Sequence, residues 1–73
     1  MKKRFNMVDL DCANCAAKME AAIKKIDGVN DAAVSFLAQK LVLDADDARF
    51  DEILSQAIAA IKKVDRNVEV IVK

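Results

Sequence analysis

Residues 4–15 decide the fold, and they read RFNMVDLDCANC. Phe5 and Met7 alternate with polar residues, which predicts a strand over Arg4–Leu10. This strand runs directly into two cysteines three positions apart, the only cysteines in the chain. A helical pattern begins at about Asn14, the predicted cap, and includes the second cysteine, Cys15. We therefore expect a turn from a strand into a helix that carries two thiols.

Two amphipathic helices are predicted from the spacing of apolar residues. The first runs from about Asn14 to Gly28, the only glycine, which we expect in a left-handed C-terminal cap. Its apolar positions are Cys15, Met19, Ile23 and Ile26. The second follows Asp46 and Asp47, which offer caps. Its apolar positions are Phe50, Leu54, Ala57, Ile58, Ile61 and Val64.

Three further strands complete the pattern. Residues 34–36 and 41–43 are short β-like runs whose four-residue connection suits a hairpin, and we expect them to form the central pair of strands. Residues 68–72 alternate as a last strand. The order β-α-β-β-α-β predicts an α+β, ferredoxin-like sandwich with a four-stranded antiparallel sheet and two helices on one face.

Size and composition limit the classes of function. The 73 residues fit one domain, 1–73, and the 12 basic residues balance the 12 acidic ones. A nucleic-acid binder is disfavoured, because it would need a basic face and stacking aromatics. No apolar run approaches the ~20 residues that span a bilayer, and the N-terminus lacks the apolar stretch that is typical of a signal peptide. We expect a cytosolic domain that does not itself insert into a membrane.

The two thiols suit metal capture. At a strand-to-helix turn the sulfurs of Cys12 and Cys15 point at one spot, where the helix N-terminus stabilises the metal-binding thiolate form. In a reducing compartment such a pair is a metal or redox motif rather than a structural disulfide. Lys18 is interpreted as a solvated lysine, with a further lowering of the thiol pKa as the alternative.

Asp11 bears on which ion the thiols would take. Two thiolates alone satisfy Cu(I), whereas Zn(II) and Cd(II) prefer about four ligands and accept carboxylate oxygen. Because Asp11 directly precedes Cys12, its carboxylate can reach an ion held by both sulfurs. A solvated loop or capping aspartate is the alternative interpretation, and Asp9 is a weaker ligand candidate.

The predicted site is open. The chain has no histidine and no third cysteine, so one chain cannot build a closed zinc site from cysteine and histidine alone. An open position suits an ion that is handed to a partner by ligand exchange. We expect a monomer, and a four-ligand site shared between two copies stays open as an alternative.

The opening strand, the segment LDCANCAAKME and the β-β-α-β remainder together resemble the heavy-metal-associated domain of metallochaperones and heavy-metal P-type ATPases. The family motif G-M-x-C-x-x-C aligns with residues 9–15, so the resemblance implies metal-ligand roles for Cys12 and Cys15. An aspartate before the first cysteine resembles the zinc, cadmium and lead exporters. There it is implied as a third ligand, which extends to Asp11.

The chain departs from the family pattern in two places. Leu10 replaces the usual methionine, and its similar volume should preserve the core; Asp9 replaces the glycine. In the loop before the last strand, Asp65 and Arg66 stand where the family carries a Gly-aromatic pair or a lysine. Arg66 would neutralise the site or Asp65 would add an oxygen, and solvated loop charges are the favoured interpretation of both.

The resemblance implies reversible capture of one Zn(II) or Cd(II) per monomer, with Pb(II) tolerated. The domain would be the cytosolic N-terminal part of a metal-exporting P-type ATPase in the cell membrane, with catalysis elsewhere in that protein. Met1 fits a true N-terminus, so any missing part is expected downstream. A free-standing metallochaperone, which docks on a transport partner, is the nearest variant.

Two alternatives belong to other classes. A Cu(I) chaperone or copper-ATPase domain would use the two cysteines only. A thiol oxidoreductase is disfavoured, because residues 13–14 are Ala-Asn rather than the Gly-Pro of thioredoxins and the second half of that fold is absent.

Overall fold

The computed structural model describes residues 1–72, in which strands and helices follow the predicted order. The elements are β1 (Lys2–Val8), α1 (Ala13–Lys24), β2 (Val29–Ser35), β3 (Lys40–Ala45), a 3-10 turn (Asp47–Arg49), α2 (Phe50–Val64) and β4 (Glu69–Ile71). Within these described residues, neither helix has the length and apolar character that crossing a membrane requires.

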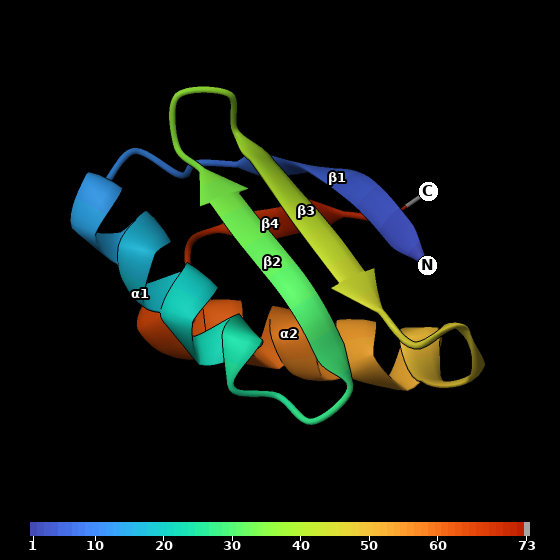
Figure 1. Cartoon of the computed structure of the whole chain (residues 1–73). Coiled ribbons are helices and arrows are strands. Elements are labelled where there is room, and N and C mark those ends of the chain that lie inside the picture. Colours follow the sequence, from blue (N-terminus) through green and yellow to red (C-terminus); the bar gives the residue numbers. More distant parts are fainter. Residues whose placement is uncertain (73) are drawn as a thin grey trace.

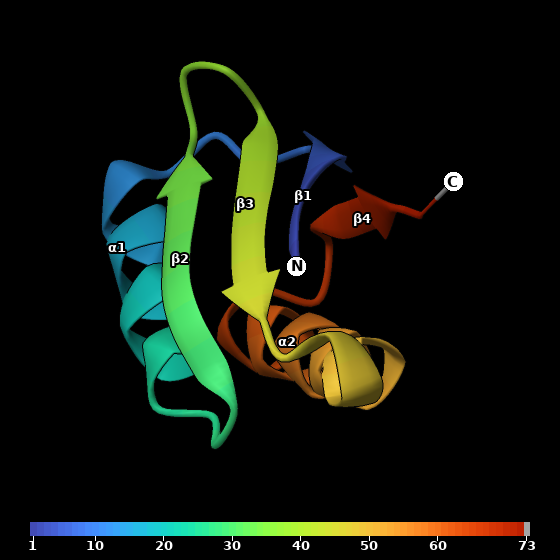
Figure 2. The same ribbon diagram turned by 45° about the vertical axis from the view of Figure 1, so that its right-hand side comes forward.

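The strands form one antiparallel sheet in the order β2-β3-β1-β4, and both helices cover the same face of it (Figures 1 and 2). The ferredoxin-like α+β sandwich is therefore confirmed. The expectation that β2 and β3 form the central pair is wrong: they pair with each other, but β2 lies at an edge. The reason is that each helical connection skips one strand, which leaves β3 and β1 in the middle.

The strand ends differ from those predicted because pairing, and not local propensity, sets them. β2 starts at Val29, well before the predicted residue 34, since its pairing with β3 extends back to Val29, with one register shift between Val29 and Asp31. β4 is shorter than predicted, because only three of its residues pair with β1. β1 stops at Val8, where the next residue, Asp9, adopts φ 65°, a left-handed conformation that cannot continue a strand.

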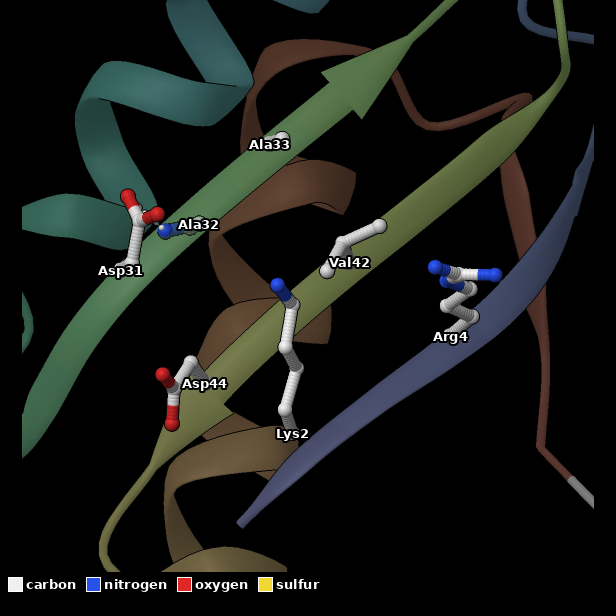
Figure 3. Close-up of a pocket in the computed structure, with 7 residues that line it drawn as sticks. All are labelled: Lys2, Arg4, Asp31, Ala32, Ala33, Val42 and Asp44. Carbon is white, nitrogen blue, oxygen red and sulfur yellow. Dashed lines mark hydrogen bonds between the residues drawn. The ribbon is translucent and has the colours of Figure 1, made fainter.

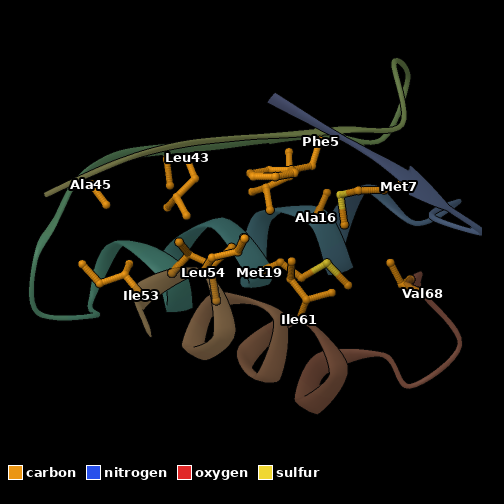
Figure 4. Packing of buried hydrophobic residues seen from close by; sticks show 14 of the residues in the cluster. Phe5, Met7, Ala16, Met19, Leu43, Ala45, Ile53, Leu54, Ile61 and Val68 are labelled. Atoms are coloured by element: carbon orange, nitrogen blue, oxygen red, sulfur yellow. The ribbon is translucent and has the colours of Figure 1, made fainter. Parts of the chain in front are cut away.

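The hydrophobic core fills the space between the sheet and the helices (Figure 4). Phe5 and Met7 point inward from β1, as their alternation predicts, and the Phe5 ring lies 6.4 Å from that of Phe50 on α2. Ile53 is fully buried although it was not among the predicted apolar positions of that helix. The buried residues are Phe5, Met7, Leu10, Ala16, Met19, Ile23, Ala32, Leu41, Leu43, Ala45, Phe50, Ile53, Leu54, Ala57, Ile61 and Val68.

Both helices start differently from the prediction. The cap of α1 is Cys12 and not Asn14: the Sγ of Cys12 accepts a hydrogen bond from the N–H of Cys15 at 3.2 Å. A serine hydroxyl makes the same i to i+3 contact at many helix starts. Asp46 does act as a cap, but of the 3-10 turn that precedes α2, where its Oδ1 accepts from the N–H of Ala48 at 3.1 Å.

Gly28 has the expected left-handed backbone, with φ 97°, but it is not the C-terminal cap of the first helix. α1 already ends at Lys24, and Gly28 lies in the turn that leads into β2. A Cβ at this position would stand 2.6 Å from the Cδ1 of the buried Ile53. Gly28 is therefore required both by the backbone conformation and by the close approach of α2.

Gly28→Ala is expected to lower the free energy of unfolding by about 1–3 kcal/mol, because it combines a strained φ with overpacking against Ile53. Chemical denaturation with linear extrapolation measures this change. Asn30→Ala, at an exposed position two residues further on, is the control and should stay within about 0.5 kcal/mol of the parent protein. Equal stabilities of the Gly28 variant and the control would contradict this account of the turn.

Candidate metal centre

The β1–α1 loop, which carries the predicted ligands, lies at the same end of the sandwich as the β2–β3 hairpin (Figure 1). Hydrogen bonds join these two loops, since Leu10 in the first contacts Gln39 in the second. The end of α2 is close as well, because the charge of Asp65 acts on the thiol of Cys15. Three parts of the chain, namely the β1–α1 loop, the β2–β3 hairpin and the end of α2, therefore bear on the two cysteines or on the loop that carries them.

The structure brings the two cysteines together at the first turn of α1. Cys12 occupies the cap position and Cys15 follows within the helix, and both are half-buried free thiols. The carbonyl of Cys12 also accepts the first helical hydrogen bond, from the N–H of Ala16 at 3.0 Å. Since Ala16 is buried and the side chain of Cys15 packs against the core, the backbone of this turn is fixed from below.

The surroundings of Cys12 lower the pKa of its thiol. The largest cause is the side-chain hydrogen bond with Cys15, followed by the backbone N–H of Cys15. Partial burial opposes this, the N–H of Asn14 adds to it, and the negative charge of Asp11 works weakly against it. Donors directed at a sulfur stabilise its charged form, so Cys12 is the first of the two to become a thiolate.

The pKa of Cys15 is raised. The main cause is its hydrogen bond to Cys12, then burial, the charge on Cys12 and the charge of Asp65. Lys18 acts in the opposite direction and lowers the pKa of Cys15, but does not outweigh the others. The pair therefore shares one proton readily, and the second proton leaves only at higher pH or when a cation displaces it.

Asp11 lies outside any formed cluster. It is exposed, and its charge reaches the thiol of Cys12. Among residues 1–72, however, no three histidine, cysteine, aspartate or glutamate side chains gather around one point. The two cysteines are thus the only predicted ligands that a hydrogen bond joins, at 3.2 Å between the Cys15 nitrogen and the Cys12 sulfur, and Asp11 is not part of a formed three-residue group in this part of the chain.

The structure explains why Leu10 and Asp9, the two departures from the family motif before Asp11, are compatible with this loop. Leu10 is only 1% exposed, so it fills the core position of the motif's methionine. Asp9 adopts φ 65°, the left-handed region that favours the motif's glycine and that aspartate tolerates better than most residues. Asp9 thus has a conformational role in the loop, and it is exposed.

The loop before β4 contributes charge rather than a formed ligand. Asp65 ends α2, and its Oδ1 accepts a hydrogen bond from the N–H of Asn67 at 3.0 Å, which ties the carboxylate to its own turn. Arg66 is exposed. Of these two loop charges, Asp65 is therefore the one that the structure connects to the cysteines.

Sequence reasoning missed Gln39. Its side chain makes hydrogen bonds to the backbone of Leu10, 29 positions earlier in the chain. A polar residue in a hairpin loop gives no signal of such a contact, because only the fold brings the two loops together.

The outer face of the sheet, which no helix covers, carries a shallow hollow of about 190 Å³ (Figure 3). It contains side chains of both charge signs and none of the predicted site residues. Its lining consists of Lys2, Arg4, Asp31, Ala32, Ala33, Val42 and Asp44.

Curated relatives of the chain are much longer proteins. It is 34% identical over 70 residues, 96% of its length, to the cadmium, zinc and cobalt-transporting ATPase of Bacillus subtilis. It is 43% identical over 54 residues, 74% of its length, to the zinc/cadmium/lead-transporting P-type ATPase of Escherichia coli. The matches cover 10% of the first relative and 7% of the second, so the chain spans at most a tenth of their length.

Solved structures give full-length matches. The N-terminal domain of ZntA in its Zn(II) form superimposes with a TM-score of 0.74 at 33% identity, covering 96% of this chain and 88% of that one. The CopZ metallochaperone gives a TM-score of 0.76 at 27% identity, covering 97% and 100%. The sequence pattern of the heavy-metal-associated domain matches residues 4–68, nearly the whole chain. The chain therefore belongs to the heavy-metal-associated domain family.

Proposed function

We propose that this domain captures one Zn(II) or Cd(II) ion, and accepts Pb(II), through Cys12, Cys15 and Asp11, and then releases it to a transporter. The observation that carries the proposal is the pair of thiols at the start of α1, joined by the hydrogen bond from the N–H of Cys15 to the Sγ of Cys12 at 3.2 Å. Thiolates at such a position are ligands for soft cations.

The aspartate supports a divalent ion. Two thiolates and a carboxylate carry three negative charges, which suits a doubly charged cation that accepts oxygen. Asp11 is exposed, so its rotation toward an ion between the sulfurs displaces no packed group. The relatives agree with this choice, since the Bacillus subtilis protein is named for cadmium, zinc and cobalt and the Escherichia coli protein for zinc, cadmium and lead.

Asp11→Ala is expected to weaken Zn(II) and Cd(II) binding by at least ~10–100-fold while leaving the Cu(I) affinity nearly unchanged. A ligand should matter at least as much as the outer groups that orient ligands, whose loss costs about that much. Competition titration of the reduced protein, with stoichiometry read by native mass spectrometry, measures all three ions.

The control for lost charge is Asp51→Ala, an exposed aspartate in the first turn of α2, at the far end of that helix from Asp65. It should change each affinity by less than about twofold, because salt screens exposed charges beyond ~10 Å. Equal losses for all three ions in the Asp11 variant, or equal losses in both variants, would remove Asp11 from the ligand set.

A Cu(I) module is the second candidate, and one observation favours it. Only the two sulfurs are already together, and no third ligand is in place among the described residues. Two thiolates satisfy Cu(I) without further change. Tight Cu(I) binding that is indifferent to Asp11, with weak Zn(II) binding, would replace the first proposal with this one.

The apparent affinity for Zn(II) is expected to rise with pH, because the metal displaces thiol protons. The pKa of Cys12 is lowered and that of Cys15 raised, so proton release should fall in two steps as the pH increases, first from Cys12 and then from Cys15. Calorimetric titrations in buffers of different ionisation enthalpy count the released protons at each pH. An affinity that does not change between about pH 6 and 9 would contradict thiolate ligation.

The place of the domain in a larger protein is also part of the proposal. Because the chain spans so small a share of its relatives, we propose that it is the cytosolic metal-binding domain of a metal-transporting P-type ATPase in the cell membrane. Transport and ATP hydrolysis would be carried out by the remainder of that protein. The domain would act as a monomer, and an ion shared by two copies would appear as a 2:1 complex in the native mass spectra.

A further inference from the structure

Gln39 connects the β2–β3 hairpin to the β1–α1 loop, residues 9–12, which carries the proposed ligands and is called the metal-binding loop below. Its Oε1 accepts a hydrogen bond from the N–H of Leu10 at 3.0 Å, and its Nε2 donates to the carbonyl of the same residue. Nε2 also donates to the carbonyl of Phe36 at 2.6 Å, within the hairpin itself. The side-chain amide thus pairs with both backbone groups of Leu10, as a neighbouring strand would.

A second contact supports the same junction. The backbone carbonyl of Gln39 accepts a hydrogen bond from the N–H of Met7 at 2.7 Å, just beyond the last β1–β3 pair of Asn6 with Lys40. Gln39 has φ 54°, a left-handed conformation that a residue other than glycine adopts at a cost. The hairpin therefore keeps a strained residue at the point where side chain and backbone both reach the metal-binding loop.

Leu10 needs these partners because its side chain is only 1% exposed and its backbone passes into the molecule with it. Buried N–H and C=O groups without partners are costly, and β1 has already ended at Val8. The amide of Gln39 supplies hydrogen-bond partners for the backbone of Leu10, beyond the end of the β1 strand.

Asp11 lies between two fixed points. On one side Leu10 is held by Gln39, and on the other Cys12 is held by the helical hydrogen bonds from Cys15 and Ala16. The Leu10 carbonyl belongs to the planar peptide bond that leads into Asp11, so holding this carbonyl also holds the backbone nitrogen and Cα of Asp11. If the Gln39 amide is lost, Cys12 keeps its hydrogen bonds from Cys15 and Ala16. The backbone at Asp11 is then held on the Cys12 side only.

We infer that Gln39 is a positioning residue for metal binding: by pairing with the backbone of Leu10, its amide holds the backbone at Asp11 in the place from which the Asp11 carboxylate rotates to an ion held by the two cysteines. This inference rests on the proposed function. The positioning is selective, since it acts on the oxygen ligand and leaves the two sulfurs in place. Gln39 therefore contributes to the preference for divalent over monovalent soft ions.

The test is a double-mutant cycle with Gln39→Asn and Asp11→Ala in the reduced protein, read by competition titration with Zn(II) and Cu(I). Asparagine keeps the amide and suits a left-handed backbone, but it is one methylene too short for the contact, so the hairpin should still fold. Gln39→Asn is expected to weaken Zn(II) binding about tenfold when Asp11 is present, but less than about twofold when it is alanine. The Cu(I) affinity should not change.

The matched control is Gln56→Asn, the same substitution at an exposed position of α2, which should leave both affinities unchanged. A readout without metal accompanies the titrations. In the metal-free protein, hydrogen exchange of the Leu10 amide should speed up in the Gln39 variant and not in the control.

The outcomes separate the inference from the proposed function. A Zn(II) affinity that depends on Asp11 but not on Gln39 overturns the positioning role alone. A loss in the Gln39 variant that is the same with and without Asp11 also overturns it, since that indicates general destabilisation. If Asp11→Ala by itself leaves the Zn(II) affinity unchanged, the proposed ligand set fails and the positioning role fails with it. Unchanged exchange at Leu10 overturns the contact itself.

Discussion

The hydrogen bond from the N–H of Cys15 to the sulfur of Cys12 is the interaction on which the site depends. The Cys12 sulfur caps the start of α1 and is also a proposed ligand, so the helix N-terminus and the proposed metal centre are the same place. The two thiols also differ in pKa: the hydrogen bond between their side chains is the main cause that lowers the pKa of Cys12 and raises that of Cys15, and the N–H of Cys15 lowers the pKa of Cys12 further. A helix start is a suitable position for thiolates, since its unpaired N–H groups and partial positive charge favour negative charge.

The core supports this arrangement from both sides of the loop. Leu10 before the cysteines and Ala16 after them are buried, and Met19 fixes the next turn of α1. Between these anchors the cysteines are half-buried and Asp11 is exposed. In the proposed site the two sulfurs are therefore held by the backbone around them, whereas the exposed carboxylate would be free to approach an ion and to withdraw from it. That combination fits reversible capture better than permanent binding.

Local patterns in the sequence predict much of this molecule. The alternation of Phe5 and Met7 and the helical spacing of Met19 and Ile23 predict the inward faces correctly. All four residues are buried, because the period of a strand or a helix places these apolar side chains on one side of the element. The two-cysteine turn is predicted from its position between a strand and a helix.

Local propensity does not reveal features that depend on distant partners, such as the length of β2, which follows from its pairing with β3. The cap at Cys12 was missed because Asn14 is the more common capping residue. Gln39 was missed because its contact with Leu10 exists only in the folded chain.

The central claim is that one divalent ion is bound by two sulfurs and a carboxylate oxygen of a single chain. X-ray absorption at the zinc edge of the protein loaded with one equivalent of Zn(II) tests it most directly. The account predicts two sulfur neighbours at about 2.3 Å and oxygen neighbours at about 2.0–2.2 Å, in a protein that stays monomeric. A shell of four sulfurs in a dimer, or two sulfurs with a set of oxygens that is unchanged when Asp11 is replaced, would contradict it.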